Sequence, residues 1–177
     1  MTARGDAGEL WKEFKRRLYS DERSLCLRRD LHEPFESPAA KIEWRIRPLQ
    51  SKDVPKLFDE YDRDASKEAV KERARRKLFL QANIPTCYVA VTKDDEPCYM
   101  QWLMSAEHND EIQSYFNGGF PVLNSDEGLL EFAFTLEKYR GLRIMPLAMA
   151  EIAKNGKAFG ARYIITFVRE DNIPSLK

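Results

Sequence analysis

A short basic segment stands directly before an apolar repeat in the last quarter of the sequence. Residues 139–152 read YRGLRIMPLAMAEI, in which Arg140 and Arg143 flank Gly141. The apolar repeat is typical of an amphipathic helix, and the first turn of a helix carries unpaired N–H groups and the positive end of the helix dipole. These groups attract anions, and guanidinium groups add bidentate contacts to phosphate oxygens. The residues therefore favour either a site for a ligand with several phosphates or a solvated loop.

The elements around this segment must position it. The apolar runs LLEFAFTL at 129–136 and ARYIITFV at 161–168 predict strands, and residues 146–159 predict a helix between them. Gly141 permits a positive φ or a close backbone approach, and Pro146 fits a first helical turn because its missing N–H would be unpaired there anyway. A strand–helix–strand connection this short predicts that the two strands are adjacent and parallel.

The preceding part of the chain predicts further strands and helices. We expect strands at 42–49, 86–92 and 98–105, the last two joined as a β-hairpin. We also expect helices at 53–62 and 66–81 and an ordered loop at 106–127. Asp53 is the expected N-cap of the first helix. In the second helix, Val70, Ala74 and Leu78 share the expected inner face. Its basic run ERARRK at 72–77 is interpreted as a solvated surface.

The order of these elements predicts the fold class and its parts. Helices interspersed with strands indicate an α/β fold with an α+β-like mixed sheet. Residues 41–177 form the expected main domain. Residues 1–40 form an expected N-terminal arm, with a helix at 9–19 and a strand at 24–31.

The strand–loop–helix unit resembles the GNAT superfamily of N-acetyltransferases. In that family a motif of the form Q/R-x-x-G-x-G/A wraps the pyrophosphate of acetyl-CoA. The motif falls on residues 140–145: Arg140 matches its first position, and Gly141 matches a glycine that commonly follows. Arg143 and Met145 depart from the two glycine or small positions. An arginine at 143 either replaces backbone contacts by side-chain contacts or blocks the site.

The resemblance extends over residues 42–177. IRPLQSKDVPKLF at 46–58 is similar to the first strand and helix of the family, and YVAVTKDDEPCYMQWL at 88–103 is similar to its second and third strands. Asn172 matches an asparagine that often contacts the cofactor. The resemblance thus implies a GNAT-like acyl-CoA N-acyltransferase fold that carries an N-terminal arm.

The resemblance also implies an activity and the residues that perform it. The activity is transfer of an acetyl or other acyl group from acetyl-CoA to a primary amine of a small molecule or peptide, with no metal. The implied cofactor-binding residues are Phe134, Thr135, Leu136, Arg140, Gly141, Leu142, Arg143, Ile144, Met145 and Asn172. Glu131 is the candidate general base, with Glu137 as a weaker candidate; the alternative is that Glu131 pairs with an arginine or faces solvent. Tyr115 and Phe116 are candidates for acceptor contact.

The family's usual last strands and its tyrosine general acid would lie beyond Lys177. Three explanations are open: a truncated chain, a partner chain that supplies the missing strands, as in a homodimer, or an N-terminal arm that fills the gap. The strand pattern at 24–31 supports the third explanation, but we favour truncation. An alternative function is a non-catalytic GNAT-like module that binds CoA or a partner chain.

The composition of the sequence argues against some classes of partner. The sequence carries 29 basic and 29 acidic residues, which argues against a nucleic-acid partner. It contains no apolar run of membrane-spanning length, so no membrane partner is expected. The three cysteines are scattered and lack metal-ligand spacing. Reduced cysteines and the absence of a signal-peptide pattern favour a cytoplasmic location.

Overall fold

A computed structural model describes residues 23–36, 39–59, 67–82, 84 and 86–176. The chain divides into a larger compact unit, residues 28–166, and a smaller one formed by residues 1–27 and 167–177. The expected helix at 9–19 lies outside the described residues. Among the described residues, no helix has the length and apolar character needed to cross a bilayer.

The strands form one mixed sheet in the order β1-β6-β5-β4-β3-β2. The strands are β1 (Ser24–Asp30), β2 (Trp44–Pro48), β3 (Cys87–Thr92), β4 (Pro97–Ser105), β5 (Glu127–Thr135) and β6 (Tyr163–Arg169). From β2 to β5 each neighbouring pair is antiparallel, whereas β5 and β6 are parallel. The predicted hairpin and the predicted parallel pair are therefore both confirmed.

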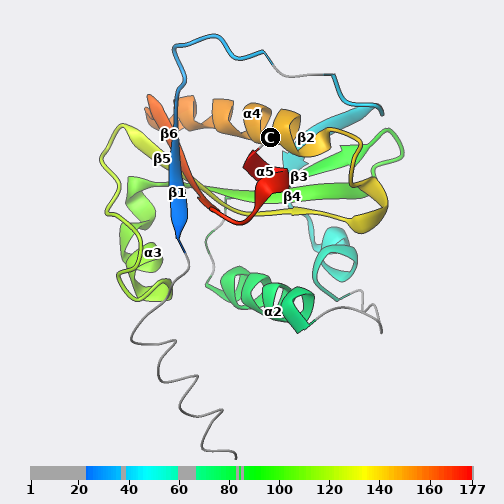
Figure 1. The fold of residues 1–177 in the computed structure, drawn as a ribbon, viewed down its shortest axis with the longest axis horizontal. Helices are drawn as coiled ribbons and strands as arrows, with labels where there is room; N and C mark the ends of the chain where they lie inside the picture. Colours follow the sequence, from blue (N-terminus) through cyan, green and yellow to red (C-terminus); the bar gives the residue numbers. More distant parts are fainter. Residues whose placement is uncertain (1–22, 37–38, 60–66, 83, 85, 177) are drawn as a thin grey trace, which may run out of the picture. The chain divides into compact units, whose positions relative to one another are not determined.

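Helices cover both faces of the sheet in the larger unit. The helices are α2 (Lys67–Gln81), α3 (Asn109–Tyr115), α4 (Ile144–Lys154) and, in the smaller unit, α5 (Ile173–Leu176). Figure 1 shows α4 on one face and α2 and α3 on the other. On the α4 face, Ala148 and Ile152 are buried in one core cluster with Tyr99, Leu103 and Leu130 of the sheet.

Strand β1 takes the position beside β6. In the larger unit the Leu31 N–H donates to the Arg162 carbonyl at 2.8 Å, and the Arg162 guanidinium pairs with Asp30 at 2.9 Å. The N-terminal segment thus supplies the strand that borders β6, which is the third of the explanations considered from the sequence. A bordering strand satisfies backbone groups that an open edge would leave unpaired.

The structure corrects two sequence predictions about helices. The predicted helix at 53–62 is wrong at its start, because Ser51–Asp53 is a 3-10 turn and Pro55–Asp59 is a π-helical turn. Asp53 is not an N-cap but the buried third residue of the first turn, where its carboxylate accepts the N–H of the N-cap Gln50. The predicted inner face of α2 is also wrong, since Val70 is 40% and Leu78 58% exposed. Phe79 is buried in their place because its ring packs on Trp102, with ring centroids 5.1 Å apart. In the segment predicted as a loop at 106–127, α3 occupies part of the chain.

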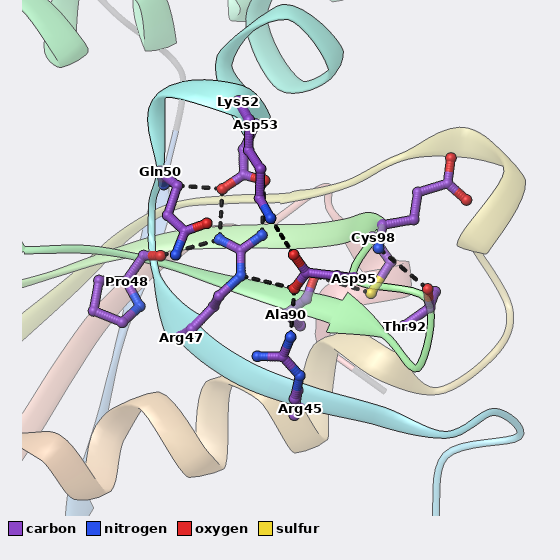
Figure 2. A network of polar contacts seen from close by, with 11 residues as sticks. Arg45, Arg47, Pro48, Gln50, Lys52, Asp53, Ala90, Thr92, Asp95 and Cys98 are labelled. Atoms are coloured by element: carbon purple, nitrogen blue, oxygen red, sulfur yellow. Dashed lines mark hydrogen bonds and ion pairs between the residues drawn. The ribbon is translucent and has the colours of Figure 1, made fainter.

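A buried ion pair joins β2 to the turn that follows it. Arg47 donates two hydrogen bonds to the carboxylate of Asp53, at 2.6 and 2.8 Å, and the Gln50 N–H donates a third at 2.9 Å (Figure 2). Burial alone would raise the pKa of Asp53, but the hydrogen bonds from Arg47 and Gln50 outweigh it and hold that pKa below its usual value. The pair therefore stays charged and closes the turn.

The same arginine reaches the turn between β3 and β4. Arg47 Nε donates to Asp95 at 3.0 Å, and Asp95 also pairs with Arg45 and Lys52 (Figure 2). Hydrogen bonds from Lys52 and Arg47 lower the pKa of Asp95 to about 2. This network fastens the edge strand β2 to the β3–β4 hairpin.

Replacing Asp53 by Asn should destabilise the protein strongly, because it leaves the buried Arg47 charge without its carboxylate. We expect a loss of about 3 kcal/mol in the free energy of unfolding, measured by urea denaturation. Asp94→Asn, an exposed change in the β3–β4 turn, is the control and should leave stability within about 0.5 kcal/mol of the wild type. Equal effects of the two changes would show that the pair contributes nothing specific.

Candidate functional site

Strand β5 carries a bulge at the point where its pairing with β6 ends. The parallel register runs from Glu127–Tyr163 to Leu130–Thr166. On the other side, Glu131 opposes Trp102 and Phe134 opposes Met100, so two β5 residues lie opposite Gln101 alone. Phe132, one of the two, has φ 56°, in the left-handed region that a phenylalanine rarely adopts. The bulge bends the strand and leaves an extra residue outside the ladder.

The register assigns Glu131 and Phe134 to one face of the sheet. Residues directly opposite each other in an antiparallel pair project to the same side. Trp102, the partner of Glu131, is fully buried and packs on Phe79 of α2, so Glu131 projects to the α2 face. Glu131 is half-buried there. This is the position from which a carboxylate could accept a proton from a group that approaches the bulge.

The candidate acceptor residues Tyr115 and Phe116 join an aromatic cluster on this face. Their ring centroids lie 4.8 and 6.1 Å from that of Phe79, and both are 6.0 Å from Phe132. The Tyr115 hydroxyl donates to the Arg75 carbonyl of α2 at 2.9 Å. The two rings are thus half-buried on the α2 face. An acceptor that approached this face could contact them.

The loop between β5 and α4 is anchored by Glu96 of the β3–β4 turn. Glu96 accepts hydrogen bonds from the Tyr139 hydroxyl at 2.6 Å, Lys138 at 2.7 Å and Lys56 at 3.1 Å. Hydrogen bonds from Lys138, Tyr139 and Lys56 lower the pKa of Glu96 to about 2, so it is ionised at neutral pH. Tyr139 and Lys138 belong to the 3-10 turn Glu137–Tyr139. The turn is therefore held in place immediately before Arg140.

The backbone after Arg140 turns twice through the left-handed region. Gly141 has φ 73°, one of the two uses considered for this glycine beside a close backbone approach, and Arg143 has φ 60°. Arg143 is the N-cap of α4, and no side chain caps that helix end. The loop therefore keeps, at Arg143, a backbone conformation that glycine adopts without strain. The first N–H groups of a helix have no partner within the helix, and groups of this kind bind phosphate.

The residues predicted to bind the cofactor differ in how exposed their side chains are. The side chain of Arg140 is 61% exposed, and its Nε donates to the Thr135 carbonyl at 3.4 Å. Gly141 and Arg143 are also exposed, and Leu142 and Met145 are half-buried. Ile144 is 1% exposed in the core beneath α4, so only its backbone is available. Phe134, Thr135 and Leu136 lead directly into this loop.

Asn172 belongs to the smaller unit, where its N–H donates to the Arg169 carbonyl at 2.9 Å. It is therefore not among the residues that the larger unit brings together.

Two residues of this region were missed from the sequence. Glu96 has no sequence signal beyond its place in a charged turn. Arg76 lies in the basic run interpreted as a solvated surface, but it is 6% exposed and stacks on Phe134, 3.7 Å from the ring centroid. Its spacing of three residues from Phe79 was the available signal, since positions three apart share a helix face.

No protein-family model matches the sequence, and no curated protein matches it. Solved structures do. The GCN5-related glucosamine N-acetyltransferase region of a fungal multi-domain β-N-acetylglucosaminidase matches with a TM-score of 0.61 and 11% identity over 99% of this chain and 22% of that one. A protein assigned as a phosphinothricin N-acetyltransferase matches with a TM-score of 0.51 and 17% identity over 76% of this chain and 77% of that one.

A conserved protein of unknown function from Staphylococcus epidermidis matches with a TM-score of 0.51 and 12% identity over 95% of this chain and 60% of that one. The chain thus spans under two thirds of two of these three structures. The similarity shows that this chain has the fold of the GCN5-related N-acetyltransferases, the GNAT fold expected from its sequence. In the described part of the chain, no group of three or more His, Cys, Asp or Glu side chains gathers as metal ligands would.

Replacing Arg143 by Gly should stabilise the protein, because glycine adopts the left-handed conformation without the penalty paid by other residues. We expect a gain of about 1 kcal/mol in the free energy of unfolding, measured by urea denaturation. The converse change, Gly141→Ala, should destabilise by about 1 kcal/mol through its φ alone, since nothing lies within 4 Å of the added Cβ. A loss of stability in Arg143→Gly would show that the arginine side chain holds this turn together.

Proposed function

We propose that this protein is an acetyl-CoA-dependent N-acyltransferase that acts on a primary amine of a small molecule or peptide. The observation that carries the proposal is the course of the chain from Glu131 to Ile144. A bulged strand end is followed at once by an anchored basic loop and an uncapped helix N-terminus. The strand end and the helix end are separate binding surfaces, one for an acyl group and one for phosphates, and the fold joins them in a single segment.

The residues of the loop fit the phosphates of CoA. Arg140 offers an exposed guanidinium, and the first N–H groups of α4 add dipolar donors. Pro146 removes one N–H from the first turn without loss to the helix. Because Arg143 keeps the left-handed conformation, loss of the family's glycine does not change the path of the backbone there. Acetyl-CoA, when bound, supplies the acyl group as an activated thioester.

The residues of β5 then orient the reactants. The backbone of Phe134, Thr135 and Leu136 lies between the bulge and the phosphate loop, where it can hold the pantetheine arm. Glu131 accepts a proton from the acceptor ammonium, directly or through a water molecule, because only the neutral amine is a nucleophile. The rings of Tyr115, Phe116 and Phe132 exclude water from that side of the strand.

Arg140→Ala should weaken CoA binding by roughly 1–3 kcal/mol, because it removes a charge-assisted contact to phosphate. Isothermal titration calorimetry with CoA measures the change. Lys154→Ala, which removes an exposed cation at the opposite end of α4, is the matched control and should leave affinity unchanged. A wild-type protein that fails to bind CoA would contradict the proposed function itself.

Glu131→Gln should leave CoA affinity nearly unchanged and lower turnover by roughly 10²–10⁴-fold, because the amide cannot accept the proton. The pH–rate profile should also lose its acidic limb. Glu111→Gln, at an exposed site on α3, is the control and should retain activity. If Glu131 is structural instead, melting temperature and activity will fall together when both are measured on one preparation.

A second candidate function is a non-catalytic module that binds CoA or a partner chain. It is favoured by Arg143 and Met145, larger side chains than the family motif has at these positions. CoA binding by calorimetry together with no acetyl transfer to any amine in a broad panel would support this alternative over catalysis.

A further inference from the structure

Arg76 of α2 is a buried arginine that pairs with no carboxylate among the residues that the structure describes. It is 6% exposed, and its Nε is enclosed without a hydrogen-bond acceptor. Its guanidinium lies 3.7 Å from the centroid of the Phe134 ring. A cation–π contact offsets part of the free energy lost when a charge leaves water, but a buried guanidinium ordinarily also pairs with a carboxylate.

The charged side chains near Arg76 do not neutralise its positive charge. Burial lowers the pKa of Arg76 to about 10, and the nearby charges of Arg73 and Arg140 contribute to the same shift. Glu72 acts in the opposite direction, but its carboxylate is exposed and accepts a hydrogen bond from Arg75 at 3.0 Å. At neutral pH Arg76 therefore remains charged, in a positive surrounding that a bound anion would neutralise.

Arg47 is a buried arginine whose charge is paired with carboxylates of the protein. Its guanidinium is 9% exposed and donates to two carboxylates, Asp53 and Asp95. Hydrogen bonding to Asp53 raises the pKa of Arg47 above its usual value, the opposite of the shift at Arg76. The two residues are similarly buried and differ in whether the protein itself supplies the anion.

The location of Arg76 indicates where its anion would come from. Phe134, on which it stacks, lies just beyond the β5 bulge and projects to the same face as Glu131. Arg140 approaches the same strand end and donates to the Thr135 carbonyl. An anion at Arg76 would therefore lie beside the proposed base, on the α2 face of the strand.

We propose that Arg76 binds a carboxylate or phosphoryl group of the acceptor, so that the substrates are small anionic amines such as amino acids or phosphorylated amines. This inference rests on the proposed acyl transfer. A guanidinium binds either group through two parallel hydrogen bonds, which polyamines and neutral amino sugars cannot accept. The same anion chemistry occurs in the phosphates of CoA, and the experiment below separates the two sources.

The test compares matched amines with and without an anionic group: β-alanine against ethylamine, and phosphoethanolamine against ethanolamine. We expect the wild type to acetylate the anionic member of a pair with a kcat/KM roughly 10–100-fold higher, as expected for a hydrogen bond to a charged group. Arg76→Gln should abolish most of this preference through KM, with acetylation of the neutral amine little changed. Arg75→Gln, which alters the exposed neighbour on α2, should keep the wild-type preference.

Two binding measurements complete the test. Arg76→Gln should bind CoA as the wild type does; a loss as large as that in Arg140→Ala would assign the anion to CoA and overturn the proposal. Without ligand, Arg76→Gln should melt at or above the wild-type temperature, because it removes an uncompensated charge. A marked drop in melting temperature with the substrate preference intact would make Arg76 structural.

The role of Arg76 in binding an anion can be tested even if no acetyl transfer is found. Calorimetry with phosphoethanolamine and ethanolamine then reports on Arg76 alone. Binding of the phosphorylated amine by the wild type and its loss in Arg76→Gln would support the anion site while the proposed acyl transfer fails. No difference between the two amines would overturn the anion site.

Discussion

Two adjacent carboxylates in the turn between β3 and β4 fix the positions of two other segments, the edge strand β2 and the loop before α4. Asp95 accepts from Arg47, which in turn closes the turn at Asp53. Glu96 accepts from Tyr139 in the loop that leads to α4. Both carboxylates are ionised because several cationic or hydroxyl donors converge on each. The edge strand β2 and the loop before α4 are distant in sequence but are held by adjacent carboxylates of one turn. Neither can shift without loosening a contact to the same hairpin.

Much of the framework could be predicted from the sequence, because apolar alternation and turn residues specify strands locally. The parallel pair of β5 and β6 was predicted for this reason. The inner face of α2 was not. In a helix dominated by charged residues, the few aliphatic side chains do not define a face, and tertiary packing placed Phe79 and Arg76 inward. The bulge at Phe132 also had no local signal, since nothing in that residue favours a left-handed backbone.

The candidate site combines elements that are fully paired with elements that are not. Arg47, Asp95 and Glu96 have their partners within the protein and serve to hold the backbone. Within the described ranges, by contrast, no side chain caps the start of α4 and no carboxylate pairs with Arg76. Unsatisfied polar groups destabilise a folded protein, and in enzymes they are commonly concentrated where a substrate completes the pairing. This contrast is the physical reason for proposing a site at this end of β5, and the fold alone would not provide it.

The bulge in β5 also determines which residues belong to which side of the sheet. Leu130 lies in the core beneath α4, and Thr135 opposes Tyr99 of that same core, although the two are five positions apart and a regular strand would place them on opposite faces. The extra residue inverts the alternation for everything downstream. Deleting one residue from Phe132–Ala133 would therefore shorten the strand very little. Glu131, one residue opposite Gln101, and Phe134 would then alternate regularly, so that Phe134 would keep its place opposite Met100 on the α2 face and only the residue that bends the strand would be lost.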